Sequence, residues 1–154
     1  MARARKATQT QSKLQMILFG EEGTGKSTLA LQLAYFKRPD GKPFRVLYID
    51  NECGSIDDFI GGLEADSINT ENIYIVYTQS LGETREYINK VKNKEDFHVL
   101  DDEGNETDEV VLDGDGEPFR ADAIVVDGTT ILNLTTKQKT VYIILEYVQK
   151  TVLI

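Results

Sequence analysis

The sequence predicts a single α/β domain in which helices cover both faces of a mostly parallel β-sheet, a three-layer α/β/α arrangement. Three observations support this prediction. Runs of buried-strand type alternate with amphipathic helical runs three times over residues 14–91, an order typical of parallel strands joined by crossover helices. Another apolar run, residues 123–127, follows a stretch rich in turns and acids. The length of 154 residues fits one domain around one core.

The first apolar run, residues 14–19, leads directly into a glycine-rich loop. Gly20, Gly25, Lys26 and Ser27 match the spacing G-x-x-x-x-G-K-[ST] of a phosphate-binding loop. In such a loop the backbone N–H groups surround a phosphate, the lysine neutralises the outer phosphates, and the serine hydroxyl is a ligand for Mg²⁺. A helix expected over residues 26–36 would direct its positive N-terminal end at the same anion. The residues expected to bind a nucleoside triphosphate are Gly20, Glu21, Glu22, Gly23, Thr24, Gly25, Lys26, Ser27 and Thr28.

The next stretch supplies two further strand–helix pairs. Residues 45–50 are apolar and rich in strand formers, so they predict a second buried strand, after which Ser55 can cap a helix. Residues 73–78 predict a third strand, and Ser80 with Glu83 forms a capping box for the following helix. The residues expected to face the core from the three helices are Leu29, Ala30, Leu33, Ala34 and Phe36, then Ile56, Phe59, Ile60 and Leu63, then Tyr87, Ile88 and Val91.

Residues 93–120 interrupt this alternation and concentrate the acidity. The window 95–117 holds 11 of the 26 acidic residues and none of the 17 basic ones, so the net charge of −9 belongs to this insertion and the rest of the chain has 15 acids against 17 bases. Residues 97–100 and 110–112 predict an exposed antiparallel hairpin across an acidic turn, with a second turn at 113–116. A calcium loop is the alternative for the second turn, but Pro118 stands where that loop requires glycine.

Residues 123–127 predict a buried strand that ends in a carboxylate. Downstream of a phosphate loop, Asp127 is placed to hold Mg²⁺, directly or through water, opposite the Ser27 hydroxyl. Many ATPases with such a loop carry a glutamate directly after this aspartate to activate the attacking water, but here the next residue is Gly128. The best candidate for that base is Glu52, because the carboxyl ends of parallel strands meet at the ligand. Asp50 lies on the same edge and could also polarise water.

The two ends of the chain allow more than one interpretation. Residues 131–154 carry Val141, Ile144, Leu145, Val148 and Val152 at helical spacing, which favours a helix, although the run Val-Tyr-Ile-Ile suits a strand equally well. Residues 1–13 are basic and polar and carry no acid. They predict either a solvated terminus or a flexible basic arm that contacts nucleic-acid phosphates. Residues 14–154 form the expected core.

Three stretches together resemble the ATPase core of RecA-type recombinases: Gly-Glu-Glu-Gly-Thr-Gly-Lys-Ser, Leu-Tyr-Ile-Asp-Asn-Glu and Ile-Val-Val-Asp-Gly-Thr-Thr. The chain is most similar to compact phage nucleotide-binding ATPases of RecA-like fold, over about residues 14–134 without the acidic hairpin. The resemblance implies Mg²⁺ and ATP as cofactors, ATP hydrolysis with Lys26 and Glu52 as catalytic residues, and phage DNA recombination or repair in the host cytoplasm. It also implies single-stranded DNA, further copies of the chain or recombination proteins as partners.

The sequence departs from the family pattern after Asp127. The family core continues with a helix and a strand that carries a polar sensor residue and lies between the phosphate-loop strand and the strand ending in the aspartate. Either residues 140–148 fill that gap, or the chain is a truncated core that needs more protein to complete its site. An arginine finger cannot be assigned.

Other functions compete with ATP hydrolysis. A binding module would hold ATP without turnover, and a small-molecule kinase is a second enzyme class, although the one insertion is acidic where such kinases carry an arginine-rich lid. A GTPase is disfavoured, because the N-K-x-D match at 93–96 follows a helix and the D-x-x-G match at 58–61 lies within one. Cys53 is the single cysteine and His98 the single histidine, which excludes an internal disulfide and argues against a cysteine nucleophile. Composition predicts a cytoplasmic protein without a membrane span.

Overall fold

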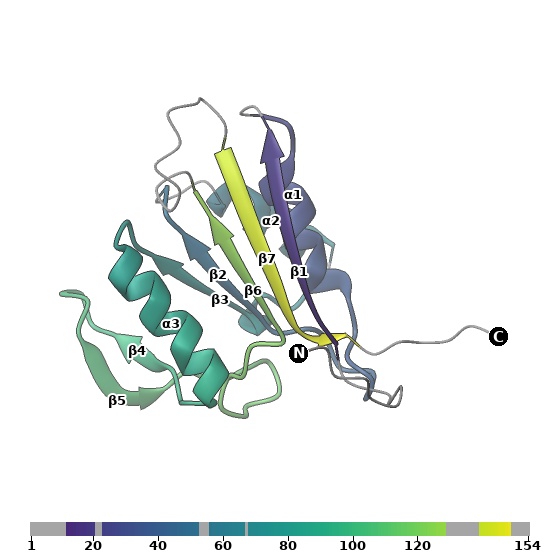
Figure 1. Ribbon diagram of the computed structural model, residues 1–154. Coiled ribbons are helices and arrows are strands. Elements are labelled where there is room, and N and C mark those ends of the chain that lie inside the picture. The colour runs from purple at the N-terminus through teal and green to yellow at the C-terminus, as the bar shows by residue number, and fades with distance from the viewer. Residues whose placement is uncertain (1–11, 21–22, 53–55, 67, 129–138, 149–154) are drawn as a thin grey trace, which may run out of the picture.

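The computed structural model describes residues 12–20, 23–52, 56–66, 68–128 and 139–148. Its helices and strands alternate along the chain as the sequence predicts up to residue 93 (Figure 1). In chain order the elements are β1 Ser12–Gly20, α1 Lys26–Leu31, the 3₁₀ helix η1 Gln32–Tyr35, β2 Val46–Asp50, α2 Asp57–Ala65, the 3₁₀ helix η2 Thr70–Asn72, β3 Ile73–Tyr77, α3 Leu81–Asn93, β4 His98–Leu100, β5 Glu106–Val110, β6 Ala123–Asp127 and β7 Lys139–Val148.

Five strands form one sheet in the order β1-β7-β6-β2-β3. Strands β6, β2 and β3 are parallel, which confirms a mixed α/β fold with a parallel sheet at its centre. Strand β7 is antiparallel to both of its neighbours, so β1 runs in the same direction as β6. Strands β2 and β6 are buried on both faces and are accordingly apolar except for the final aspartate of each, whereas the edge strand β3 is only partly buried.

The helix expected in the C-terminal stretch is wrong over residues 139–148, which form β7. This strand lies between β1 and β6, the gap that the sequence left open. A helix there would leave the facing backbone groups of β1 and β6 without partners, whereas a strand satisfies both ladders. The β-branched run therefore adopts its strand preference, because tertiary pairing outweighs helical spacing.

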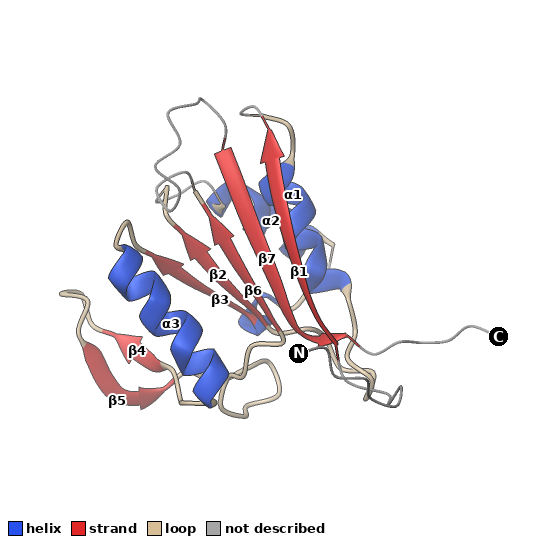
Figure 2. Cartoon of the chain, in the orientation of Figure 1, coloured by secondary structure: helices blue, strands red, loops and turns tan. Residues whose placement is uncertain are grey.

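Helices lie on both faces of the sheet (Figure 2). On one face, residues of α1, η1 and α2 pack with alternate residues of β2 and β6, including Val46, Tyr48, Ala123 and Val125. On the other face, α3 and the insertion pack against the intervening residues, including Leu47, Ile49, Ile124 and Val126. The alternation follows from the two-residue period of a strand.

The first helix differs in detail from its prediction. The expected helix over residues 26–36 is an α-helix of six residues followed by a 3₁₀ turn. The tighter 3₁₀ turn changes the periodicity, and the buried stripe is Ala30, Leu31, Leu33 and Ala34. Leu29 and Phe36, both expected inside, are 51% and 53% exposed. The small alanines allow close packing of the helix on the sheet, beside the buried Leu31 and Leu33.

The acidic insertion forms the predicted antiparallel hairpin, with β4 paired to β5. Its second strand begins at Glu106, four residues before the expected start, so the connecting turn is shorter. The hairpin is less exposed than expected at its base, because Phe97 and Phe119 are buried and contact Tyr74, with ring centroids 5.6 and 5.8 Å from that tyrosine. Figure 1 shows the hairpin beside α3, on the β3 side of the sheet.

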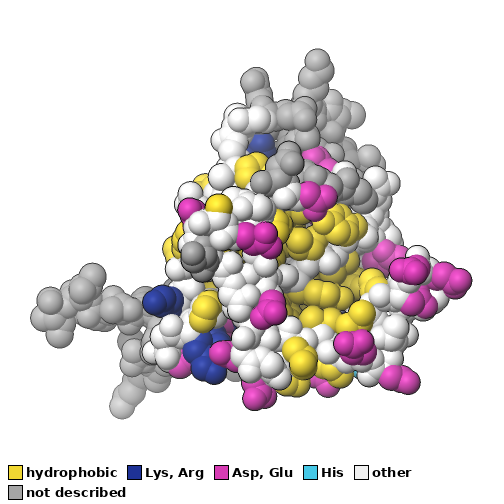
Figure 3. All heavy atoms as spheres, turned by 180° about the vertical axis from the view of Figure 1, so that it is seen from behind, with side chains coloured by type: hydrophobic (Ala, Val, Ile, Leu, Met, Phe, Trp, Pro, Cys, Tyr) yellow, Lys and Arg dark blue, Asp and Glu magenta, His cyan; other side chains and the backbone are white. Residues whose placement is uncertain are grey.

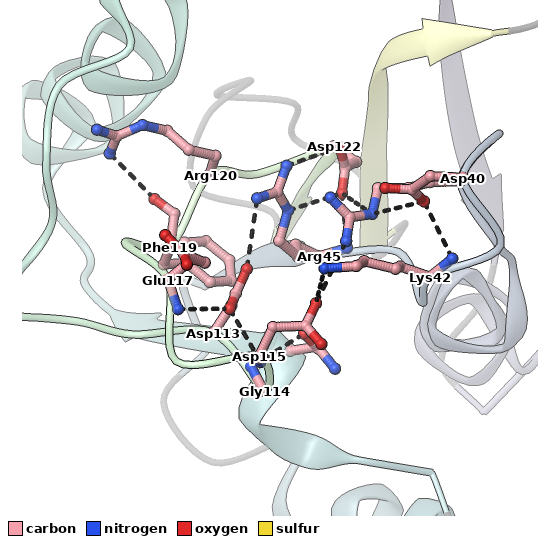
Figure 4. Close-up of polar contacts among 12 residues, drawn as sticks. Asp40, Lys42, Arg45, Asp113, Gly114, Asp115, Glu117, Phe119, Arg120 and Asp122 are labelled. Carbon is pink, nitrogen blue, oxygen red and sulfur yellow. Dashed lines mark hydrogen bonds and ion pairs between the residues drawn. The ribbon is translucent and has the colours of Figure 1, made fainter.

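The second turn of the insertion is held by an ion-pair cluster at the amino ends of β2 and β6 (Figure 4). Arg45 donates through Nε and Nη2 to the two carboxylate oxygens of Asp122, at 3.0 and 3.2 Å, and its Nη1 lies 3.4 Å from Asp113. Lys42 pairs with Asp115 at 3.0 Å. The carboxylates of the rejected calcium loop are thus bound to basic side chains. Within the described ranges no group of His, Cys, Asp and Glu side chains forms a metal cluster.

Candidate functional site

The strand register aligns the predicted site residues along one edge of the sheet. Leu18 of β1 pairs with Val141 of β7, and Val141 pairs with Asp127 at the end of β6. Asp127 in turn pairs with Asp50, the last residue of β2. The glycine-rich loop therefore begins at Gly20, two residues beyond Leu18. Glu52 lies two residues beyond Asp50, just after the end of β2. Residues separated by a hundred positions in sequence share one edge because four strands run in the same direction.

The glycine-rich loop leaves β1 at Gly20 and enters α1 at Lys26. Gly23 and Gly25 have φ angles of 77° and 80°, a left-handed conformation that residues with a Cβ rarely adopt. The Lys26 ammonium donates to Thr24 Oγ1 at 3.1 Å, across the turn of the loop. Glu21 and Glu22 lie outside the described residues. The left-handed φ of Gly25 therefore accounts for that glycine of the motif, and Gly23 adds a second left-handed residue at a position where the motif allows any residue.

Ser27 and Asp127 meet at the centre of the site. The Ser27 hydroxyl donates a hydrogen bond to Oδ2 of Asp127, although the two residues are 100 positions apart. Asp127 is 2% exposed. The Tyr48 hydroxyl donates to the same Oδ2 at 2.5 Å. Burial, followed by the charge of Asp127, raises the pKa of the Tyr48 phenol far above its ordinary range, so the phenol keeps its proton and acts as a donor.

The carboxyl end of β2 is a tightly hydrogen-bonded turn. The fully buried Asp50 carboxylate accepts from the backbone N–H of Glu52 at 2.8 Å, which fixes the first step beyond the strand. Asn51 donates its backbone N–H to the Asp127 carbonyl at 2.8 Å and its side-chain Nδ2 to the Thr78 carbonyl at 2.9 Å. Of the two acids considered as a base, Asp50 shapes the turn, whereas Glu52 is only partly buried. Glu52 is therefore the more exposed of these two acids.

Gly128 explains why no glutamate follows Asp127. Its φ is 145°, and a Cβ added there would lie 2.6 Å from Cβ of Asn51. Real Cβ atoms do not approach so closely, so any side chain at position 128 would displace the turn that carries Glu52. The β6 and β2 turns are packed against each other, so position 128 cannot carry an acidic side chain without moving them.

The third parallel strand contributes a second polar anchor. The Ser80 hydroxyl accepts from the Glu83 N–H at 3.3 Å, which confirms the cap predicted for α3. The Glu83 carboxylate accepts from the Thr78 hydroxyl, and Thr78 Oγ1 accepts from the Ser80 N–H at 2.9 Å. Because Asn51 holds the Thr78 carbonyl, the ends of β6, β2 and β3 form one connected network.

A cavity of about 200 Å³ adjoins the last residue of the glycine-rich loop. It lies between α1 and α2 and is mainly apolar, with the Tyr35 hydroxyl donating to Asp66 at 2.5 Å on its wall. Sequence reasoning did not find it, because it assigned Phe59 to the core, whereas Phe59 is 36% exposed and lines the cavity. The lining residues are Thr28, Leu31, Gln32, Tyr35, Phe59, Gly62, Leu63 and Asp66.

The competing motif matches lie where the sequence placed them. The N-K-x-D match begins at Asn93, the last residue of α3, and its Asp96 carboxylate is paired with Arg120. The D-x-x-G match lies inside α2. Cys53 lies outside the described residues. Neither match follows a strand, so neither can present a carboxylate to a base from the ligand edge of the sheet.

No family model, no curated protein sequence and no solved structure matches the chain. The residues themselves therefore carry any functional conclusion. In the described part of the chain, no helix has the length and apolar character needed to cross a membrane.

Proposed function

We propose that the chain is a Mg²⁺–ATP-binding P-loop protein of RecA-like type that hydrolyses ATP. The observation that supports this most directly is the contact between the Ser27 hydroxyl and the Asp127 carboxylate at the end of β6. Two motifs that sequence reasoning assigned separately to one metal site are joined by a hydrogen bond. A chance match to a glycine-rich loop would not be expected to place its serine on an aspartate 100 residues away.

The donor set fits Mg²⁺. A serine hydroxyl and an aspartate carboxylate are hard oxygen ligands, and Mg²⁺ usually takes one or two protein ligands and completes its shell with water and phosphate oxygens. Ser27 and Asp127 would hold the ion. Once bound, it would neutralise charge on the phosphate oxygens during transfer.

Each remaining site residue has a part in binding or orienting the substrate. The amides of the glycine-rich loop and the Lys26 ammonium bind the β- and γ-phosphates. The apolar cavity beyond Thr28 is placed to take the nucleoside, since it adjoins the loop that would hold the phosphates. Glu52, partly buried beside the Asp127 turn, orients or deprotonates the water that attacks the γ-phosphate.

Phosphate release separates turnover from binding. We expect Glu52→Gln to retain ATP binding and to lose hydrolysis by about 100-fold or more, the usual contribution of a general base. Lys26→Ala is the matched control, because it removes a phosphate contact and is expected to weaken binding itself. Equal release rates for the wild type and Glu52→Gln would exclude Glu52 as the base.

A binding module without turnover is the second candidate, and the direction of β7 favours it. Strand β7 occupies the sheet position in which the RecA-type core carries its sensor strand, but it is antiparallel to β6. Its carboxyl end therefore lies at the edge opposite Asp127, and only its amino end, with Thr140 and Lys139 in register with Phe19 and Gly20, lies at the edge of the glycine-rich loop. Absence of phosphate release from the wild type, together with Mg²⁺-dependent ATP binding, would select the module.

A kinase lid and a DNA surface find less support. The acidic hairpin lies beside β3, and three strands separate β3 from β1, so the hairpin cannot close over the glycine-rich loop. On the side of α1 and α2, acidic side chains surround an apolar area (Figure 3). A phosphate backbone requires basic side chains instead. Recombination therefore rests on the sequence resemblance, and ATP hydrolysis measured with and without single-stranded DNA tests it; no stimulation would argue against it.

A further inference from the structure

Tyr48 is a buried polar residue at the site to which neither motif assigns a part. It lies in the middle of β2, between β6 and β3, and is 0% exposed. Val125 of β6 is its register partner, and Asp127 lies two residues further along the same strand. The phenol thus reaches from the core to the carboxylate at the strand end, where its hydroxyl donates to Oδ2 at 2.5 Å.

The surroundings of Tyr48 do not require a hydroxyl for packing. The ring belongs to the apolar cluster formed with α1, α2 and β6, and phenylalanine would fill the same space. A buried hydroxyl needs a hydrogen-bond partner, and the Tyr48 hydroxyl has the Asp127 carboxylate, with the Ser27 hydroxyl also within hydrogen-bonding reach. The hydroxyl is therefore explained by the carboxylate that it contacts.

Tyr48 and Ser27 act on the same carboxylate oxygen. Both hydroxyls donate to Oδ2 of Asp127, and Oδ1 accepts no hydrogen bond from the described residues. The terminal torsion of an aspartate is broad and has no strong preference of its own. Two donors from different elements, β2 and α1, fix that torsion and leave the other oxygen for a further ligand.

We propose that Tyr48 is a positioning residue that orients the Asp127 carboxylate for Mg²⁺. This inference rests on the proposed function, because the metal site is part of it. Groups that orient a metal ligand from outside the coordination shell commonly change metal affinity by about 10–100-fold when removed. Tyr48 would set the Mg²⁺ concentration at which the protein holds Mg²⁺–nucleotide, without contacting the nucleotide itself.

The test is the Mg²⁺ dependence of nucleotide binding by the full chain. A fluorescent ATP analogue is titrated at a series of free Mg²⁺ concentrations and with EDTA, using the wild type and Tyr48→Phe. We expect Tyr48→Phe to raise the Mg²⁺ midpoint by about 10-fold or more. Binding in EDTA should stay unchanged, since the loop amides and Lys26 are untouched.

Tyr74→Phe is the matched control. Its hydroxyl donates to the His98 carbonyl at 3.2 Å on the other face of the sheet, so its loss removes a tyrosine hydrogen bond away from the site. An unchanged midpoint in Tyr48→Phe, or an equal shift in Tyr74→Phe, would overturn the inference. A wild type that binds no nucleotide, or binds it independently of Mg²⁺, would instead overturn the proposed function.

A second measurement covers the case in which Tyr48→Phe does not fold. 3-Fluorotyrosine placed at position 48 of the otherwise unchanged chain reports on the phenol by ¹⁹F NMR. Its resonance should move when Mg²⁺ is added to the nucleotide-bound protein and stay in place when EDTA is added instead. A resonance that Mg²⁺ does not move would overturn the inference.

Discussion

Replacing Gly128 by alanine tests the contact between the turns that end β6 and β2. The added Cβ would lie 2.6 Å from Cβ of Asn51, and the φ of 145° is strained for any residue with a side chain. The unfavourable backbone conformation costs about 1–3 kcal/mol, and forcing a methyl group into a packed site costs about 1–3 kcal/mol. Gly128→Ala should therefore lower the free energy of unfolding by about 2–6 kcal/mol in urea titrations.

Two further glycines separate the two contributions. Gly104 has a φ of 84° and no atom within 4 Å of an added Cβ, so Gly104→Ala should cost only the backbone term, about 1–2 kcal/mol. Gly61 lies inside α2 in open space, and Gly61→Ala should stabilise the protein by about 0.5–1 kcal/mol. A loss in Gly128→Ala no larger than in Gly104→Ala would refute the close packing of the two turns. Gly128→Ala should also impair the proposed ATP hydrolysis, because Asn51 directly precedes Glu52.

Two other predictions concern the insertion and its surroundings. Burial alone would lower the pKa of Arg45, but its bonds to Asp122 and Asp113 outweigh this and raise the pKa. Arg45→Met removes the guanidinium from both carboxylates, although Asp122 keeps its ion pair with Arg38 and Asp113 keeps two backbone N–H donors. We expect a loss of about 1.5–3 kcal/mol in urea unfolding, against less than about 0.5 kcal/mol for the exposed Arg85→Met; equal losses would contradict the role of Arg45 in the ion-pair cluster. Burial raises the pKa of Tyr87 to about 12, above about 10 in the unfolded chain, so the folded protein keeps its proton longer. The contribution of the Tyr87 phenol to the free energy of unfolding should be full below about pH 10 and should be lost as the pH rises toward about 12. Tyr87→Phe should therefore flatten the decline in stability over this pH range. A decline that Tyr87→Phe leaves unchanged would show that the ionisation of Tyr87 does not cause it.

The predicted elements that proved correct are those whose signal is local. The apolar strands β2, β3 and β6, the Ser80 cap of α3 and the acidic hairpin each follow from a few consecutive residues. The C-terminal stretch and the inner face of α1 did not follow in this way. Residues 139–148 became a strand because two other strands needed a partner, and Leu29 is exposed because α1 buries Ala30 and Leu31 instead.

The sequence by itself determined the chemistry available at the site: a glycine-rich loop with Lys26 and Ser27, and the acids Glu52 and Asp127. Each of these lies at or just after the end of an apolar strand. Only the tertiary structure decided which of these side chains touch. It joined Ser27 to Asp127, added Tyr48 to the same oxygen, and assigned Asp50 to a turn. The physical reason is that the spacing of residues along the chain determines which face of a helix or strand each side chain occupies. Strand order and register, which set distances between elements, depend on pairing energies summed over the whole sheet.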